Sequence, residues 1–382
     1  MAVLRGRLTF NATTGAAIAS EMVGMGPTAA FISFRLGGTD GVAIEAGKWA
    51  QALATLGFET RRIAGEIAGN PAPGDIVIPG LAIGAEAAPD PDGLVAAIAG
   101  ADLLIVENLL SLPLNLPAAR TLTDALTTWG GRVLLHHHDL AWQRDHLAHI
   151  TELPPLLPDS VHVTINDLSR RELARREVAA HTVHNCFDLD APPGDRLVTR
   201  ARLGVADDDI VVLQPTRAIE RKGVPRALGL AHALSDLVPD RTVRYWLAGE
   251  VEEDYGPTLD DLLEKARVPV LRDRSPEMAD MYAACDLVAF PSTWEGFGNP
   301  VIESVWARRP LVVGHYPVLD ELLAYGFRFL DVDDPVGITK WLRDPDPSVY
   351  DENLAIARKH FSLETLVDQL HSVFQKVGWT DW

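Results

Sequence analysis

The stretch FPSTWEGFGNPVIESVWARRPLVVG, Phe290 to Gly314, carries the most informative pattern for the fold. Two glutamates, Glu295 and Glu303, bracket a Gly-Phe-Gly-Asn-Pro run, and Pro300 suits the first turn of a helix. The apolar run CDLVAFPS at 285–292 precedes this turn and is typical of a buried strand. In an open parallel sheet, ligands bind outside the carboxyl ends of the strands, where loops lead into helices. The stretch therefore predicts a strand, a ligand-binding turn and a helix of an α/β sheet.

Similar apolar runs alternate with amphipathic stretches along most of the chain. They are continuous in Val, Ile and Leu, as expected for strands buried on both faces of a parallel sheet. The linker-like segment DLDAPPGDR at 188–196 separates two series of them. The first series lies at 29–34, 74–80, 102–108, 131–139 and 161–166, and the second at 209–216, 243–249, 268–273, 285–292 and 310–314. The sequence therefore predicts an α/β protein with two doubly wound, Rossmann-like parallel-sheet domains facing a central cleft.

The linker also sets the expected domain boundaries. We expect a loosely ordered leader over 1–28, a first domain over 29–190 and a second domain over 191–361. A final helical stretch over 362–382 carries an apolar stripe at helical spacing. The length of 382 residues agrees with two domains of roughly 150 residues or more.

Composition excludes several classes of partner. The net charge of −19 argues against nucleic acid, because binding a phosphate backbone requires clustered Lys and Arg. No apolar run reaches the roughly 18 to 20 residues of a membrane span. The only cysteines, Cys186 and Cys285, are too few for a disulfide framework and favour a reducing compartment, so we expect a cytoplasmic protein.

Two stretches of the first domain follow predicted strands and carry candidate binding residues. Gly37 and Gly38 would let backbone amides approach a ligand, beside a helix N-terminus that favours an anion, although a tight turn alone would also use glycine there. In HHHDLAWQR at 136–144, neighbouring histidines on a strand point to opposite faces, so the three cannot share one metal ion. We expect no metal, and one functional histidine, His138, at the end of the strand.

Two stretches of the second domain complete the candidate site. Arg217 and Lys222 precede a helix, where two cations could bind a diphosphate without metal; a solvated basic turn is the alternative interpretation. Glu295 and Glu303 lie on either side of the glycine turn, so each carboxylate could accept hydrogen bonds from a different set of hydroxyl groups. That arrangement suits a ligand with a sugar at each end of a diphosphate.

Together these motifs resemble the retaining glycosyltransferases of family 4, which adopt the GT-B fold. The run Glu295–Glu303 matches the two-glutamate pattern E-G-F-G-x-P-x-x-E of that family, and Arg217–Gly223 matches its R-x4-K-G diphosphate loop. The stretch H-D-L-A-W-Q at His138–Gln143 is similar to a motif of bacterial glycogen synthases. The likeness spans residues 29–325 and implies a nucleotide-sugar donor in the second domain and an acceptor in the first.

The resemblance also implies roles for the site residues. Arg217 and Lys222 would hold the donor diphosphate, Glu295 would lie beside the transferred hexose, and Glu303 would bind the ribose. His138 would lie near the transferred sugar. The remaining substrate-binding residues would be Gly37, Gly38, Asp139, Gly296, Phe297, Gly298 and Asn299. In GT-B folds the final helix returns to the first domain, so 362–382 is expected to pack there.

The resemblance implies transfer of a hexose with retention of configuration and no cofactor beyond the donor. UDP-glucose and GDP-mannose are the leading donors, and the acceptor could be a small molecule, a glycan or a lipid. Two other activities fit the same motifs: a GT-B nucleotide-sugar epimerase, and a non-catalytic regulatory protein that binds a nucleotide sugar. Incubation with the donor alone separates them, because only an epimerase would change the sugar without an acceptor.

Overall fold

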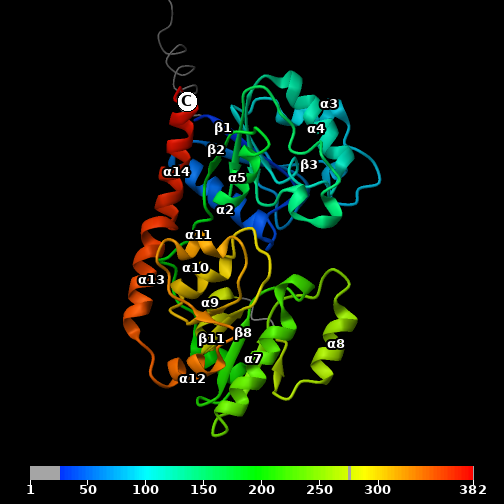
Figure 1. The fold of residues 1–382 in the computed structure, drawn as a ribbon. Coiled ribbons are helices and arrows are strands. Elements are labelled where there is room, and N and C mark those ends of the chain that lie inside the picture. Colours follow the sequence, from blue (N-terminus) through cyan, green and yellow to red (C-terminus); the bar gives the residue numbers. More distant parts are fainter. Residues whose placement is uncertain (1–25, 274–276, 382) are drawn as a thin grey trace, which may run out of the picture.

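The first parallel sheet forms one domain of a computed structural model that describes residues 26–273 and 277–381 (Figure 1). Its strand order is β3-β2-β1-β4-β5-β6-β7. The chain therefore starts at β1 inside the sheet, adds β2 and β3 on one side, and then adds β4 to β7 on the other. The strands are β1 (Thr28–Leu36), β2 (Glu59–Ile67), β3 (Ile76–Val77), β4 (Leu103–Glu107), β5 (Arg132–His137), β6 (Ser160–Thr164) and β7 (Ala180–Thr182). The expected leader over 1–28 lies outside the described residues, apart from its last three positions.

The second parallel sheet has the order β10-β9-β8-β11-β12-β13. Its strands are β8 (Ile210–Gln214), β9 (Val243–Leu247), β10 (Val270–Leu271), β11 (Leu287–Phe290), β12 (Leu311–Val313) and β13 (Leu330–Asp331). The prediction of two doubly wound parallel sheets is confirmed. The interval between β7 and β8 contains the expected boundary between residues 190 and 191.

Three of the observed strands are missing from the sequence prediction: β2, β7 and β13. The sequence of β2, ETRRIAGEI, is largely polar, and only its central residues 63–65 are buried. Strands β7 and β13 have three and two residues, so neither is long enough to show a pattern. Short or polar strands near a sheet edge bury little apolar surface, and therefore give no periodic signal.

Helices connect the strands in both domains. In the first domain they are α2 (Gly41–Thr55), α3 (Pro91–Ile98), α4 (Leu116–Trp129) and α5 (Asp167–Ala174), with short 3₁₀ turns η1 (Pro79–Leu81), η2 (Ala141–Gln143) and η3 (Asp145–Leu147). In the second they are η4 (Glu220–Lys222), α6 (Arg196–Arg202), α7 (Val224–Leu237), α8 (Gly256–Glu264), α9 (Met278–Ala284), α10 (Asn299–Trp306), α11 (Leu319–Leu323), α12 (Pro335–Arg343) and α13 (Pro347–His360). Among the described residues, no helix combines the length and hydropathy needed to cross a membrane.

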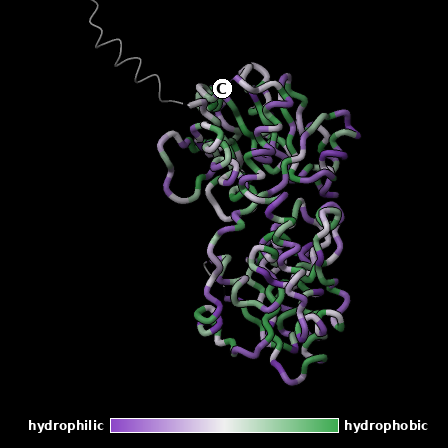
Figure 2. Tube along the Cα trace, turned by 90° about the vertical axis from the view of Figure 1, so that its left-hand side faces the viewer, coloured by the Kyte–Doolittle hydropathy of each residue, from purple (hydrophilic) through white to green (hydrophobic). Residues whose placement is uncertain are grey.

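Both sheets are buried on both faces. Successive residues of β1, Phe31 and Ile32, belong to different apolar cores, and so do Val211 and Val212 of β8. Figure 2 shows the hydrophobic segments running through the interior of both domains. Continuous apolar strands are therefore the consequence of helices covering each face, as the sequence pattern suggested.

The last helix, α14 (Leu363–Lys376), lies against the first domain. Figure 1 shows α13 and α14 running along one side of both domains. Leu366, Leu370, Val373 and Phe374 join the core that contains Trp49 and Phe58 of the first domain. The chain thus passes between the domains twice, and the two passages are joined where the Phe187 N–H donates to the Phe361 carbonyl at 2.7 Å.

Replacing a buried leucine of α14 should therefore destabilise the first domain. Leu370 is fully buried, and its change to Ala is expected to cost about 2–5 kcal/mol of unfolding free energy, because it leaves a cavity. Leu197, on α6, is 70% exposed, and Leu197→Ala should change the same quantity by less than about 0.5 kcal/mol. Urea unfolding followed by circular dichroism measures both; equal effects would contradict the packing of α14 on the first domain.

Candidate active site

The carboxyl ends of the two sheets face one another, and the loops that follow β5 and β11 are in contact. A Cβ atom on Gly296 would lie 2.7 Å from the carbonyl oxygen of His138 and 3.6 Å from Asp139 Oδ1. The side-chain amide of Asn166, at the end of β6, donates to the Gly296 carbonyl at 2.5 Å. The loop of His138 and Asp139 in the first domain and the turn at Gly296 in the second, predicted as separate parts of one site, are therefore in contact in the structure.

Lys222 and Glu295 form a buried ion pair. The Lys222 ammonium lies 2.5 and 2.7 Å from the two carboxylate oxygens of Glu295, and each residue is less than one-tenth exposed. Arg221 adds a longer contact of 3.5 Å to the same carboxylate. Burial lowers the pKa of Lys222, and the charge of Glu295 opposes that effect. A charge pair withdrawn from water is costly unless its geometry is good, and its perturbed pKa makes the pair a candidate functional site.

Backbone contacts between two loops hold this pair in place. Gln214, the last residue of β8, donates from its side chain to the Lys222 carbonyl at 2.9 Å. The Thr293 N–H donates to the Arg221 carbonyl at 2.9 Å. Gly223 has φ +67°, and a Cβ there would lie 2.7 Å from the Pro291 carbonyl oxygen, so only glycine fits. The loops after β8 and β11 therefore form one unit.

Arg217 lies at the rim rather than in the buried pair. Its side chain is 42% exposed and pairs with Glu252 at 2.6 Å. Its charge still contributes to lowering the pKa of Lys222, so the two cations lie in one electrostatic neighbourhood. Of the two predicted diphosphate ligands, Lys222 is thus the buried one and Arg217 the accessible one.

The turn between the two glutamates begins α10. Gly298 has φ +99°, and a Cβ there would lie 2.3 Å from the Tyr316 hydroxyl oxygen, so the position requires glycine. Asn299 accepts a hydrogen bond from the Asn185 side chain at 3.0 Å. Phe297 is buried among aromatic rings, including those of Phe187 and Phe361. Its side chain therefore belongs to the core, and only its backbone is available to a substrate.

Glu303 lies one helical turn into α10. Its Oε2 accepts a hydrogen bond from the Tyr282 hydroxyl at 2.6 Å, and the residue is half-buried. Burial raises the pKa of the Glu303 carboxyl, which the Tyr282 hydrogen bond and the charge of Lys48 oppose. Lys48 belongs to α2 of the first domain, so Glu303 faces that domain across the interface.

The glycine turn after β1 is also in its expected place. Gly37 has φ +75°, and a Cβ there would lie 2.6 Å from the Ala68 carbonyl oxygen. Asp40 caps α2 by accepting from the Val42 and Ala43 N–H groups at 3.1 and 3.2 Å. Gly38 lies between Gly37 and Asp40 and is half-buried. The capping carboxylate already engages N–H groups that the sequence analysis assigned to an anion, so an anion at this helix end would compete with Asp40.

Sequence reasoning missed Glu107 and Asn108, which end β4 and organise the histidine loop. Glu107 Oε2 lies 2.9 Å from His136 Nδ1 and 2.8 Å from His138 Nε2. The Asn108 side-chain oxygen accepts from the backbone N–H groups of His138 and Asp139 at 3.1 and 3.2 Å. The available signal was the position of Glu107 at the carboxyl end of a strand next to β5.

The same cluster is the one group of possible metal ligands found among the described residues. The ligand atoms of Glu107, His136 and His138 lie within 4.8 Å of one another. Both histidines approach the same carboxylate oxygen at 2.8–2.9 Å, however, whereas ligands of a tetrahedral zinc are about 3.4 Å apart when each bond is about 2.1 Å. The distances are those of hydrogen bonds. His137 points to the opposite face, where it contacts Ser111 and His162.

The residues after His138 carry further charged contacts. Asp139 pairs with Arg144 at 2.9 Å. Trp142 donates to Glu172 at 2.9 Å, and the Arg176 guanidinium lies 3.8 Å from the centroid of a Trp142 ring. The loop is therefore linked to Glu172 of α5 and to Arg176, which follows that helix.

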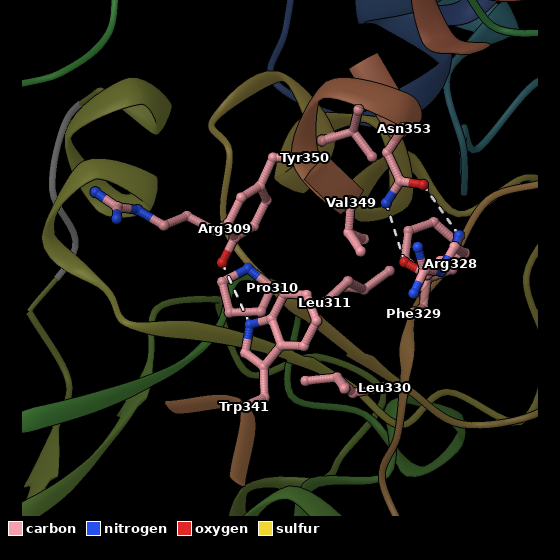
Figure 3. Close-up of a pocket in the computed structure, with 11 residues that line it drawn as sticks. Arg309, Pro310, Leu311, Arg328, Phe329, Leu330, Trp341, Val349, Tyr350 and Asn353 are labelled. Atoms are coloured by element: carbon pink, nitrogen blue, oxygen red, sulfur yellow. Dashed lines mark hydrogen bonds between the residues drawn. The ribbon is translucent and has the colours of Figure 1, made fainter. Parts of the chain in front are cut away.

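A cavity of about 280 Å³ lies elsewhere, on the second domain, and Figure 3 shows its lining. It is bordered by α10, β12, β13, α12 and α13, and includes Trp341, Tyr350 and Arg328. Its polar groups are engaged: Trp341 donates to the Tyr350 hydroxyl, and Asn353 bonds the backbone of Arg328. None of the predicted site residues lines it.

Comparison with known proteins agrees with this geometry. Residues 212–340 match the family described as Glycosyl transferases group 1. A mannosylglucosylglycerate synthase of Thermotoga maritima is 29% identical over 326 residues, which cover 70% of this chain and 75% of that protein. A second protein of that name, from Petrotoga mobilis, is 26% identical over 363 residues, covering 77% and 83%.

Solved structures show the fold. Sucrose-phosphate synthase from Thermosynechococcus elongatus has a TM-score of 0.67 at 14% identity, covering 92% of this chain and 99% of that one. Anabaena Alr3699/HepE in complex with UDP has a TM-score of 0.65 at 18% identity, covering 92% and 100%. The chain has the GT-B fold, and the family match with its curated relatives supports a hexosyltransferase. The specific likeness of the histidine motif to glycogen synthases stays a prediction.

The Lys222–Glu295 pair can be tested by a double-mutant cycle. Lys222→Met and Glu295→Gln should each lower the unfolding free energy by about 3–5 kcal/mol, because each leaves a buried charge without its main partner. The double variant should lose less than the sum, by about 0.5–3 kcal/mol. An exposed control pair, Lys265 and Asp261, should show a coupling of about 0.3–0.5 kcal/mol in the same urea experiment. Additive effects of the two changes would contradict a direct interaction between Lys222 and Glu295.

Proposed function

We propose that the protein is a retaining glycosyltransferase that moves a hexose from a nucleotide-diphosphate sugar to a hydroxyl group of an acceptor. The observation that carries the proposal is the buried Lys222–Glu295 pair, held against the loop of His138 and Asp139. A cation at this position can stabilise the leaving diphosphate, and a carboxylate beside it can accept hydrogen bonds from hexose hydroxyls.

Different residues of the site would bind different parts of the donor. Lys222, with Arg217 at the rim, would hold the diphosphate, while Glu303 would bind the ribose. Glu295 and the backbone from Gly296 to Asn299 would hold the hexose, and the turn at Gly37 and Gly38 would close over the diphosphate. Closure of the two domains over the donor would exclude water, which would protect the donor from hydrolysis and strengthen the charge interactions.

The names of the relatives narrow the substrates. Two are called mannosylglucosylglycerate synthases, which favours GDP-mannose over UDP-glucose and an acceptor that carries a carboxylate. Arg144, next to the site loop, and the arginines of α5 are the cations that such an acceptor would meet. The low cysteine content supports a cytoplasmic location, and both cysteines are buried and free.

The experiment is to incubate the purified protein with GDP-mannose or UDP-glucose, each alone and with glucosylglycerate, and to follow the products by proton NMR. Transfer with the donor's anomeric configuration retained is the expected result. Arg120→Ala, which removes an exposed arginine, is the control and should leave transfer unchanged. A changed sugar without acceptor would show an epimerase, and binding without turnover would show a regulatory protein; either overturns the proposal.

Three variants should separate the roles of the site residues. Lys222→Ala should lower kcat by about 10²–10³, because the interaction strengthens as the diphosphate leaves. Glu303→Ala should mainly raise the donor KM, because ribose contacts change little during the reaction. Glu295→Ala should lower kcat and also the discrimination between sugars. Steady-state kinetics measures these effects; an unchanged kcat in Lys222→Ala, or an unchanged donor KM in Glu303→Ala, would contradict the assignment.

The reaction should need no divalent metal. Lys222, Arg217 and the backbone amides at the start of α10 would neutralise the diphosphate, so the initial rate in excess EDTA should equal the rate with magnesium. An enzyme that is inactive in chelator and recovers on addition of magnesium would refute this prediction.

A further inference from the structure

A carboxylate and two imidazoles are buried together beneath the site loop. Glu107 is fully buried, and its Oε2 lies within hydrogen-bond distance of both His136 Nδ1 and His138 Nε2. Sheet register explains the arrangement: Glu107 of β4 lies opposite His136 of β5. Residues two apart on a strand share a face, so His136 and His138 both reach Glu107, whereas His137 cannot.

The hydrogen bonds fix one proton on each ring. A carboxylate oxygen only accepts, so His136 Nδ1 and His138 Nε2 must both be protonated. His136 Nε2 is sealed from solvent without a partner, and the ring stacks on Trp49 with centroids 4.0 Å apart. Burial lowers the pKa of His136, although the charge of Glu107 opposes it. A second proton on His136 Nε2 would have no acceptor, which favours the neutral ring.

His138 differs from His136 in its surroundings. Its Nδ1 makes no hydrogen bond within the described residues and is not among their atoms sealed from solvent. The charged groups that face the ring are Glu107 from β4, Glu45 from α2 and the adjacent Asp139. Burial lowers the pKa of His138, but the hydrogen bond and charge of Glu107, followed by those two carboxylates, raise it above the ordinary value.

The other charges near the ring are already paired. Lys48 of α2 lies 2.6 Å from Glu45 Oε1. Burial raises the pKa of the Glu107 carboxyl, and its contacts with His136 and His138 lower it to about 2. With a charged His138 and a neutral His136, the negative charge of Glu107 would be balanced inside the cluster, which lowers the cost of burying it.

We propose that Glu107 is a positioning residue for glycosyl transfer, which holds His138 by Nε2 and keeps its ring charged, so that Nδ1 is a hydrogen-bond donor toward a substrate oxygen. A neutral ring in the same pose would present Nδ1 as an acceptor, because Nε2 carries its only proton. Glu107 therefore decides which kind of substrate atom His138 can bind. This inference rests on the proposed transferase function for its catalytic part.

The first test measures the charge of His138 directly. The protein is labelled with ¹³C-histidine and titrated by NMR, and the His138 signal is assigned by its loss in His138→Gln. The wild-type pKa is expected above the ordinary value of about 6.5, and Glu107→Gln should lower it by about 1 unit or more. Glu152→Gln, an exposed carboxylate-to-amide control, should leave it unchanged. A wild-type pKa at or below about 6.5 overturns the inference even if Glu107→Gln fails to fold.

The second test uses the pH profile of kcat/KM. A charged His138 is the active form, so activity should fall as the pH rises through its pKa, and this alkaline limb should move to lower pH in Glu107→Gln by the shift seen in NMR. A lower rate with an unmoved limb would show a merely structural role and overturn the inference. Absence of transfer by the wild-type protein would instead overturn the proposed function, while the NMR titration would still decide the charge of His138.

Discussion

The close approach of the Gly296 backbone to the His138 carbonyl is the constraint on which the site depends. No side chain fits between them, since a Cβ on Gly296 would lie 2.7 Å from the carbonyl oxygen. The hydrogen bond from Asn166 to the Gly296 carbonyl holds the same peptide from the other domain. Because these loops follow β5 and β11, their contact fixes how the carboxyl ends of the two sheets face each other. This junction therefore sets the relative positions of the predicted substrate-binding residues of the two domains.

Other polar contacts reinforce the junction. Glu321 of α11 accepts from the Asp167 and Leu168 N–H groups at the start of α5, at 2.8–3.2 Å, and lies 3.3 Å from His184. Hydrogen bonds to a charged group contribute about 1.5–3 kcal/mol each, so these contacts help to hold the two domains together. The two chain passages joined at Phe187 and Phe361 connect the domains as well. In the proposed reaction the domains would have to part and close again, because the donor must enter and the product must leave.

Sequence reasoning reached the fold because each buried strand carries its own signal. It also found both members of the Lys222–Glu295 pair, but not that they pair, since 73 positions separate them and only the alternating connections of the sheet bring them together. Gly298 and Gly37 were assigned to turns because glycine lets the backbone approach a ligand closely, and both have a positive φ in the structure. Glu107 gave no such signal: a single acid at a strand end gains meaning only from the register with β5. Phe297 was assigned to the substrate as part of a motif, whereas its ring is needed by the core.

The cations of the site are already matched by carboxylates in the free protein. Lys222 pairs with Glu295, Lys48 with Glu45, and Arg217 with Glu252. These pairs hold the cations where the proposed donor needs them, which avoids a cost of ordering long side chains on binding. Binding of the donor would also require a change of partners. The Lys222 ammonium cannot give all its hydrogen bonds to a diphosphate while it is bonded to both oxygens of Glu295. For the proposed reaction, the hexose hydroxyls must therefore draw Glu295 away as the diphosphate arrives. In the proposed reaction, sugar and diphosphate would therefore be recognised together, and a nucleotide without its sugar would leave the pair intact.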